Sequence, residues 1–258
     1  MSATRLEIAK LAHLLGADPA RFHYLADLSA ADVRAVRLRA TEVLFAANRS
    51  AFERIAAASR LVPSALTAAI AQRTFGPLLS ARVAGVLEPE RAVDLAGRLP
   101  VDFLADVAAQ LDPRRAADVL VLLPVSRMVE VAGELVRRHD HITMGRFVGD
   151  LPDAALRAIV TALDEESLLR TAVYSESVDR IPTLFALITD TRLAAVAKIF
   201  ATAADDLAAD LYPLLHHLDQ AGMVRLTTAV GKLPTTQRET FRKHATAANV
   251  LPGLDRIP

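Results

Sequence analysis

Apolar residues recur along the middle of the chain at a fixed step of twelve residues. The leucines that mark this step are Leu87, Leu99, Leu111, Leu123 and Leu135, and the step resumes at Leu151 and Leu163 after a gap of sixteen residues. A proline follows each of the first four markers within two residues, and Phe75-Gly76-Pro77 and Leu61-Val62-Pro63 extend the series backwards. Regular repetition of this length predicts an array of repeated structural units.

Within each unit, the apolar positions lie five, eight, nine and twelve residues after the marker. In five units these positions read Ala92, Leu95, Ala96, Leu99; Leu104, Val107, Ala108, Leu111; Ala116, Val119, Leu120, Leu123; Met128, Val131, Ala132, Leu135; and Leu156, Ile159, Val160, Leu163. This spacing places all four residues on one stripe of an α-helix. Each unit is therefore predicted to be one short amphipathic helix.

The turns between units explain why each helix is short. Proline lacks a backbone N–H and has a fixed φ, so it suits the first turn of a helix and cannot continue the preceding one. Glu88 and Asp112 precede prolines and are expected to cap or favour the positive end of the next helix. A helix of this length is marginal alone and forms by stacking on its neighbours. The prediction is an all-α, right-handed α-solenoid of short, stacked, antiparallel helices with a helix period of twelve residues.

The pattern divides the chain into four segments. These are an N-terminal helical segment at 1–60, the repeats at 61–174, degenerate helical repeats at 175–250 and a tail at 251–258. In the first segment we expect a helix over 5–15, a turn at 16–19 and a long helix capped by Ser29. Past Tyr174 we expect a loop, then helices over 182–201, 205–217, 219–231 and 237–247.

Composition excludes several classes of protein. The chain has 258 residues, no cysteine and thirty basic residues against thirty acidic ones. It therefore has no disulfide and no thiolate metal ligand or nucleophile, and no net charge that attracts nucleic acid or anionic lipid. The longest uncharged stretch, 61–72, is too short to span a membrane. No phosphate-binding loop, nucleophile elbow or zinc signature occurs. These observations predict a cytoplasmic protein that is not an enzyme and does not insert into a membrane.

The string LDPRRAADVLVLLPVSRMVEVAGEL, which begins at Leu111, resembles the N-terminal superhelical domain of MgtE magnesium transporters. The similarity is best over residues 75–173, and weaker copies occur at Ile188 and Leu218. A more distant similarity is to the middle-domain helices of the flagellar rotor protein FliG. The paired CBS domains and the transmembrane domain of MgtE have no counterpart in this sequence. The resemblance implies a relative of the regulatory domain rather than a transporter.

The position seven residues after the marker is acidic in four consecutive units. It holds Asp94, Asp106, Asp118 and Glu130. If successive helices alternate in direction, Asp94 and Asp118 share one face, and Asp106 and Glu130 share the other. Oxygen ligands suit Mg²⁺, and the resemblance to MgtE makes Mg²⁺ the candidate cofactor. The alternative is a solvated face on which these carboxylates pair with neighbouring arginines.

Two further sets of residues are candidates for contact with a partner. Residues 1–60 hold nine basic and six acidic side chains, and Arg34 and Arg37 share one helical face. Such a face suits contact with RNA or ribosomal phosphates, although the interleaved apolar residues favour an ordinary packed helix. His141 and Arg146 lie in the gap that interrupts the repeat, and insertions in solenoids often lie on the binding face.

Three functions remain open from the sequence. The first is a non-catalytic scaffold or adaptor that binds a protein partner, with the excess of acidic residues over 86–166 favouring a basic partner surface. The second is a Mg²⁺-responsive sensor related to the MgtE regulatory domain. The third is an adaptor on the ribosome or another nucleic-acid assembly.

Overall fold

The computed structural model describes residues 3–250, and all regular secondary structure in this range is helical. The predicted all-α fold class is confirmed. The described residues form two compact units: an N-terminal unit of 3–143 and 150–155, and a C-terminal unit of 144–149 and 156–250. The predicted tail at 251–258 lies outside the described residues, and the right-handed superhelix stays a prediction.

The N-terminal unit begins with an arm, defined here as residues 3–46, and continues with the repeat helices. The arm contains α1 (Ala3–Leu14), the 3-10 helix η1 (Pro19–Leu25) and α2 (Ala30–Ala46). The helices that follow are α3 (Arg49–Ser59), α4 (Ser64–Ile70), the π-helical turn η2 (Ala71–Phe75), α5 (Gly76–Ala84), α6 (Pro89–Arg98), α7 (Val101–Gln110), α8 (Pro113–Leu122) and α9 (Val125–Arg137). Two helices, α10 (His141–Phe147) and α11 (Asp153–Ala162), contribute residues to both units.

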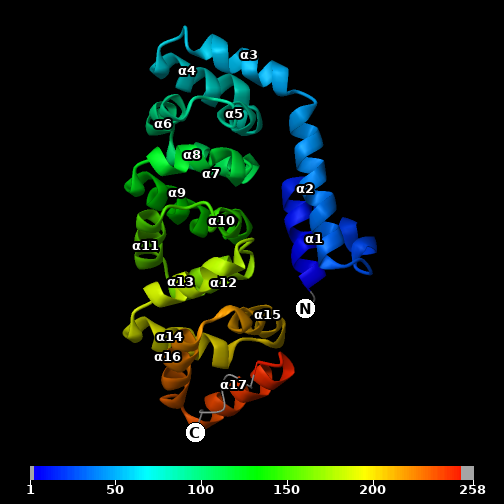
Figure 1. The fold of residues 1–258 in the computed structure, drawn as a ribbon, viewed down its shortest axis with the longest axis vertical. Coiled ribbons are helices and arrows are strands. Elements are labelled where there is room, and N and C mark those ends of the chain that lie inside the picture. Colours follow the sequence, from blue (N-terminus) through cyan, green and yellow to red (C-terminus); the bar gives the residue numbers. More distant parts are fainter. Residues whose placement is uncertain (1–2, 251–258) are drawn as a thin grey trace. The chain divides into compact units, whose positions relative to one another are not determined.

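The repeat helices of the N-terminal unit stack in two rows (Figure 1). One row consists of α3, α5, α7 and α9, and the other consists of α4, α6 and α8; each helix packs on the next member of its own row. Successive helices therefore alternate between rows, and equivalent positions recur every second helix.

The marker leucines lie between helices, as the repeat predicts. Leu99, Leu111 and Leu123 have extended backbones, with ψ between 133° and 146°. Asp112 caps α8 by accepting a hydrogen bond from the N–H of Arg114 (3.2 Å). Glu88 occupies the N-cap position of α6, where its charge favours the positive end of the helix, but its side chain accepts no capping bond and pairs instead with Arg60 at 2.5 Å.

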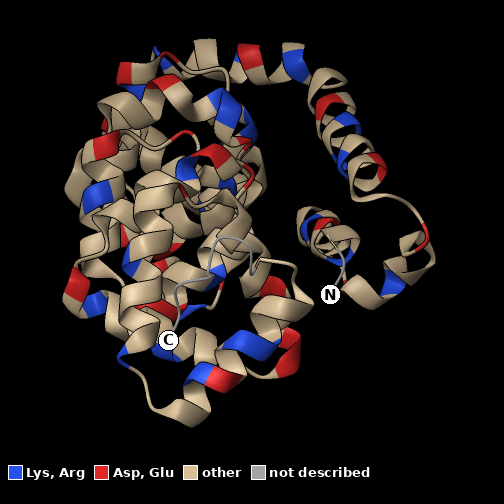
Figure 2. Ribbon diagram, turned by 60° about the horizontal axis from the view of Figure 1, so that its bottom comes forward, with Lys and Arg blue, Asp and Glu red and all other residues tan. Residues whose placement is uncertain are grey.

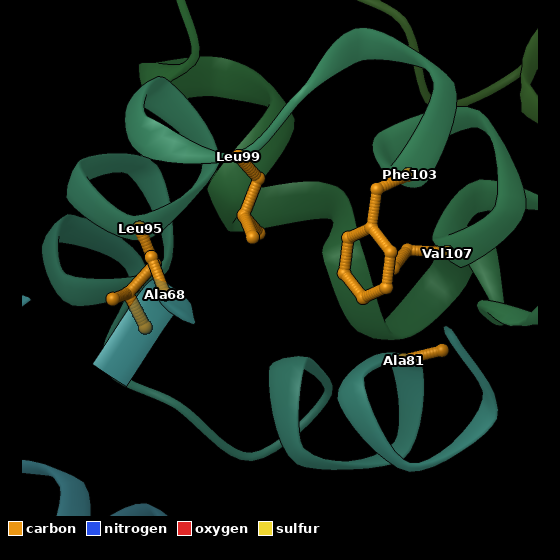
Figure 3. Packing of buried hydrophobic residues seen from close by; sticks show 6 residues of the cluster. All are labelled: Ala68, Ala81, Leu95, Leu99, Phe103 and Val107. Atoms are coloured by element: carbon orange, nitrogen blue, oxygen red, sulfur yellow. The ribbon is translucent and has the colours of Figure 1, made fainter. Parts of the chain in front are cut away.

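Every position of the predicted apolar stripe is buried or half-buried. Figure 3 shows one section of the resulting core, in which Leu95 and Ala68 come from one row and Phe103, Val107 and Ala81 from the other, with Leu99 between them. Burying a leucine or valine stabilises the fold by about 1.5–3 kcal/mol. The stripe therefore holds the two rows together.

One predicted boundary is wrong, because α9 does not stop at Leu135. No proline follows this marker, so nothing prevents the helix from continuing to Arg137. The helix ends where His139 adopts a left-handed conformation (φ 57°). The N–H of His139 donates to the carbonyl of Val136 (2.8 Å), and the N–H of Asp140 donates to the carbonyl of Leu135 (2.9 Å). This bond pair is a Schellman motif.

The C-terminal unit continues the pattern with less regular helices. They are α12 (Glu165–Val173), the 3-10 helix η3 (Val178–Arg180), α13 (Ile181–Leu187), α14 (Asp190–Thr202), α15 (Asp205–Leu211), the 3-10 helix η4 (Tyr212–His217), α16 (Gln220–Gly231) and α17 (Thr235–Ala247). Asp164 and Asp219 follow marker-like leucines and cap α12 and α16, as Asp112 caps α8.

Two helices predicted in this unit are each divided. The predicted helix over 182–201 breaks at Ile188, whose backbone is extended (ψ 124°), and α14 begins at Asp190. The predicted helix over 205–217 changes from α to 3-10 at Tyr212. Pro213 follows at once, and its missing N–H prevents the α-helical bond at that position.

Arginines connect helices that are three apart in the chain. Four arginines each donate to two backbone carbonyls at or just beyond the C-terminal end of an earlier helix. These are Arg91 of α6 at the end of α3, Arg127 of α9 at the end of α6, Arg192 of α14 at the end of α11, and Arg225 of α16 at the end of α13. The last carbonyls of a helix lack partners within it and carry partial negative charge. A guanidinium placed there satisfies those carbonyls and fixes the position of the later helix.

Candidate functional site

The four acidic side chains of the repeat are exposed or half-exposed on helices of the two rows. Asp94 and Asp118 lie on the stacked helices α6 and α8, and Asp106 and Glu130 lie on α7 and α9. This arrangement is the alternation expected from the sequence. Figure 2 shows basic and acidic residues interspersed along the helices.

Three of these carboxylates are engaged by arginines. Asp94 pairs with Arg98 at 3.1 Å, Asp106 with Arg138 at 2.5 Å, and Glu130 with Arg127 at 2.7 Å. A hydrogen bond from the hydroxyl of Ser64, together with the nearby guanidinium of Arg98, lowers the pKa of Asp94.

A magnesium site would need several oxygen ligands around one point. Within residues 3–250, no three acidic or histidine side chains come together as a group that could hold a metal ion. The acidic residues instead fit the alternative of a face with paired charges.

Glu134 joins the two ends of a small charge network in one row. Its carboxylate accepts from Arg137 (2.5 Å) and Arg138 (2.7 Å), and Arg138 also reaches Asp106 on α7. Hydrogen bonds from these two arginines lower the pKa of Glu134 to about 2. The network therefore ties α9 to α7 while its carboxylates are ionised.

This pKa shift predicts how stability depends on pH. A depressed pKa in the folded state stabilises the protein fully above the unfolded pKa, near 4.5, and this contribution is lost as pH falls towards about 2. We expect Glu134→Gln to lose stability at pH 7 and to show a smaller further loss between pH 4.5 and pH 2 than the unaltered protein. Urea unfolding at pH 7, 4 and 3 measures this difference, with Glu166→Gln on α12 as the control for an exposed pair within one helix.

The four residues predicted to contact a partner differ in exposure. Arg34 is exposed on α2, whereas Arg37 (4% exposed), His141 and Arg146 are buried. Arg37 faces inward because α1 packs on α2 and places the Glu7 carboxylate 3.0 Å from its guanidinium. His141 and Arg146 lie on α10, so the gap in the repeat contains a packed helix rather than an exposed loop. The three buried side chains offer no exposed surface in support of partner contact.

Several large apolar residues within 3–250 are exposed, and the adjacent pair on α8 breaks the pattern of the repeat. Val121 and Leu122 on α8 are 69% and 48% exposed. The equivalent positions, ten and eleven residues after the other markers, hold Gly97 and Arg98, Ala109 and Gln110, Gly133 and Glu134, and Thr161 and Ala162. Only α8 places two larger apolar side chains there among these five units. Their position next to Leu123 hides the signal, because they read as part of one apolar run.

Contacts between the arm and the repeat helices were also missed, because they join residues far apart in sequence. Arg115 on α8 donates to Glu42 on α2 (2.7 Å), and its guanidinium carbon lies 3.6 Å from the ring centroid of Phe45. His13 Nε2 on α1 lies 2.9 Å from the hydroxyl of Thr143 and 3.6 Å from the carboxylate of Asp140. No periodicity connects these positions.

The fold and its two rows define an all-α protein built from repeated short helices. Comparison of the chain with protein-family models, curated proteins and solved structures finds no match. The resemblance to the N-terminal domain of MgtE therefore stays a prediction. Within residues 3–250, no helix combines the length and the apolar character needed to cross a membrane.

Proposed function

We propose that the chain is a non-catalytic module that binds a protein partner on the outer face of the repeat row formed by α4, α6 and α8. The observation that carries this proposal is the exposed pair Val121 and Leu122, which replaces small or polar residues at equivalent positions. Contiguous exposed apolar side chains within a polar surface are typical of interaction sites, and Val121 and Leu122 are adjacent.

The charges around this pair indicate the chemistry of the partner. Asp118 is exposed one helical turn before Leu122, and Asp94 and Arg98 lie on the neighbouring helix α6. The segment 86–166 carries fifteen acidic and nine basic residues. A partner that presents an apolar side chain flanked by basic residues would match this surface.

To test this proposal, the affinity of a stoichiometric protein partner is compared between the unaltered chain and the double variant Val121→Ser, Leu122→Gln. Both positions are exposed, so the fold should tolerate the change, and loss of a central apolar anchor should weaken binding at least tenfold. Val224→Ser on α16 is the matched control, since Val224 is also 48% exposed. A stoichiometric partner that binds the double variant as tightly as the control would contradict the proposal.

The same binding measurement, repeated with added Mg²⁺ and at several salt concentrations, separates the other two functions expected from the sequence. A Mg²⁺-responsive module would change its affinity or dimensions in millimolar Mg²⁺ but not in Ca²⁺, and Asp94→Ala with Asp118→Ala would abolish that change. Contact with nucleic acid would show a steep decrease in affinity with salt, because phosphate contacts release counterions. Apolar contact at Val121 and Leu122 predicts neither response.

A further inference from the structure

The arm has a hydrophobic core of its own. Ile8 and Leu11 of α1 pack against Val33 of α2, and Phe22 and Leu25 of η1 cover this cluster. The hydroxyl of Ser29 caps α2 by accepting from the N–H of Asp32 (3.1 Å). Helix α1 packs against the N-terminal part of α2 (Figure 1).

The arm is joined to the repeat helices near the end of α2. Phe45 is buried in a cluster with Phe52 and Ala56 of α3 and Val83 of α5, and the guanidinium of Arg115 lies over its ring. Just beyond it, Ala47 and Asn48 separate α2 from α3, and the side chain of Asn48 makes no capping bond. A short junction without a side-chain cap is a suitable place for a change of backbone angle.

The other end of the arm is fastened by His13. The hydroxyl of Thr143 donates to Asp140 (2.7 Å), so it can only accept a hydrogen bond from His13, whose Nε2 must carry the proton. Asp140 also accepts from the N–H of Thr143 (3.0 Å). Thr143 has no exposed surface. The contacts of His13 in this fastening are polar, and polar contacts open at lower cost than a hydrophobic core.

We propose that the arm is a strap that pivots at Phe45 and is latched by His13 on Thr143. In the closed state Thr143 is covered and is not available to an outside ligand. Opening the strap frees the surface around Thr143, while the Arg115 guanidinium stays on the ring of Phe45 at the pivot. The inference concerns motion within the chain and does not depend on the proposed function or on any partner.

Pulsed electron paramagnetic resonance between two spin labels tests the strap. The chain has no cysteine, so Tyr24→Cys on the exposed η1 and Ser126→Cys on α9 carry the only labels. In this labelled parent we expect the closed distance to dominate, with a smaller open population beside it. His13→Ala and Thr143→Val each remove the latch hydrogen bond and should raise the ratio of open to closed arm about fivefold.

Two matched variants serve as controls. His13→Gln retains an N–H donor and should keep more of the closed population than His13→Ala, whereas His23→Ala removes an exposed histidine of η1 and should leave the parent distribution unchanged. Distributions that stay unchanged in both His13→Ala and Thr143→Val would overturn the proposal. Loss of hydrogen-exchange protection within residues 3–46 of the latch variants would also overturn it, because the arm would then unfold rather than pivot.

Discussion

Replacement of Glu7 by glutamine is expected to destabilise the N-terminal arm by about 3–5 kcal/mol. The Glu7 carboxylate accepts from Lys10 Nζ at 3.0 Å and from Arg37 Nε and a terminal nitrogen at 3.2 and 3.0 Å. The side chains of Glu7, Lys10 and Arg37 are only 10%, 5% and 5% exposed. Glutamine keeps the shape but removes the charge, and two buried cations lose the carboxylate that both of them contact.

Hydrogen exchange of the backbone amides in residues 3–46, combined with urea unfolding, measures this loss. Glu53→Gln is the matched control, because Glu53 pairs with Arg49 at 2.8 Å on an exposed surface of α3. Exposed pairs of this kind contribute about 1 kcal/mol or less. A loss for Glu7→Gln no larger than that for Glu53→Gln would show that the buried ion triad does not hold α1 on α2.

The repeat made the middle of the fold predictable from sequence. Side chains at the stripe positions follow one helical period, and the stacking that buries them uses the same positions in each unit. Asp112 could be recognised as a cap because capping depends on residues close in sequence. The end of α9 also depends on residues close in sequence. The marker Leu135 is present, but the proline that would stop the helix is absent, so the helix continues to Arg137.

Contacts of the arm could not be predicted, because their partners are distant in sequence. Arg37 and Arg34 share a face of α2 in a helical projection, and nothing in that projection shows that Glu7, thirty residues earlier, covers Arg37. Lys10 three residues after Glu7 is a visible local pair, but its burial follows from tertiary packing. The pairing of His13 with Thr143, separated by 130 residues, has no local signal either.

Phe241→Ala is expected to destabilise the C-terminal unit by about 3–5 kcal/mol. Phe241 on α17 is fully buried, and its ring centroid lies 6.2 Å from that of Phe200 on α14 and 5.2 Å from that of Tyr212. The Tyr212 hydroxyl donates to the carbonyl of Phe200 (3.1 Å), and burial raises the pKa of Tyr212 above its ordinary value. Tyr212 is therefore held in place, and the surrounding rings cannot collapse fully into the space that Phe241 leaves.

Thermal unfolding and hydrogen exchange together locate this loss. If each unit is stabilised by its own core, amides of residues 156–250 lose protection in Phe241→Ala, whereas amides of the repeat helices α5 to α8 keep theirs. Thr236→Ala, on the exposed face of the same helix, should change stability by less than about 0.5 kcal/mol. Equal loss of protection in both units would mean that they unfold as one cooperative structure, and the aromatic cluster would then stabilise the surface around Val121 and Leu122 as well.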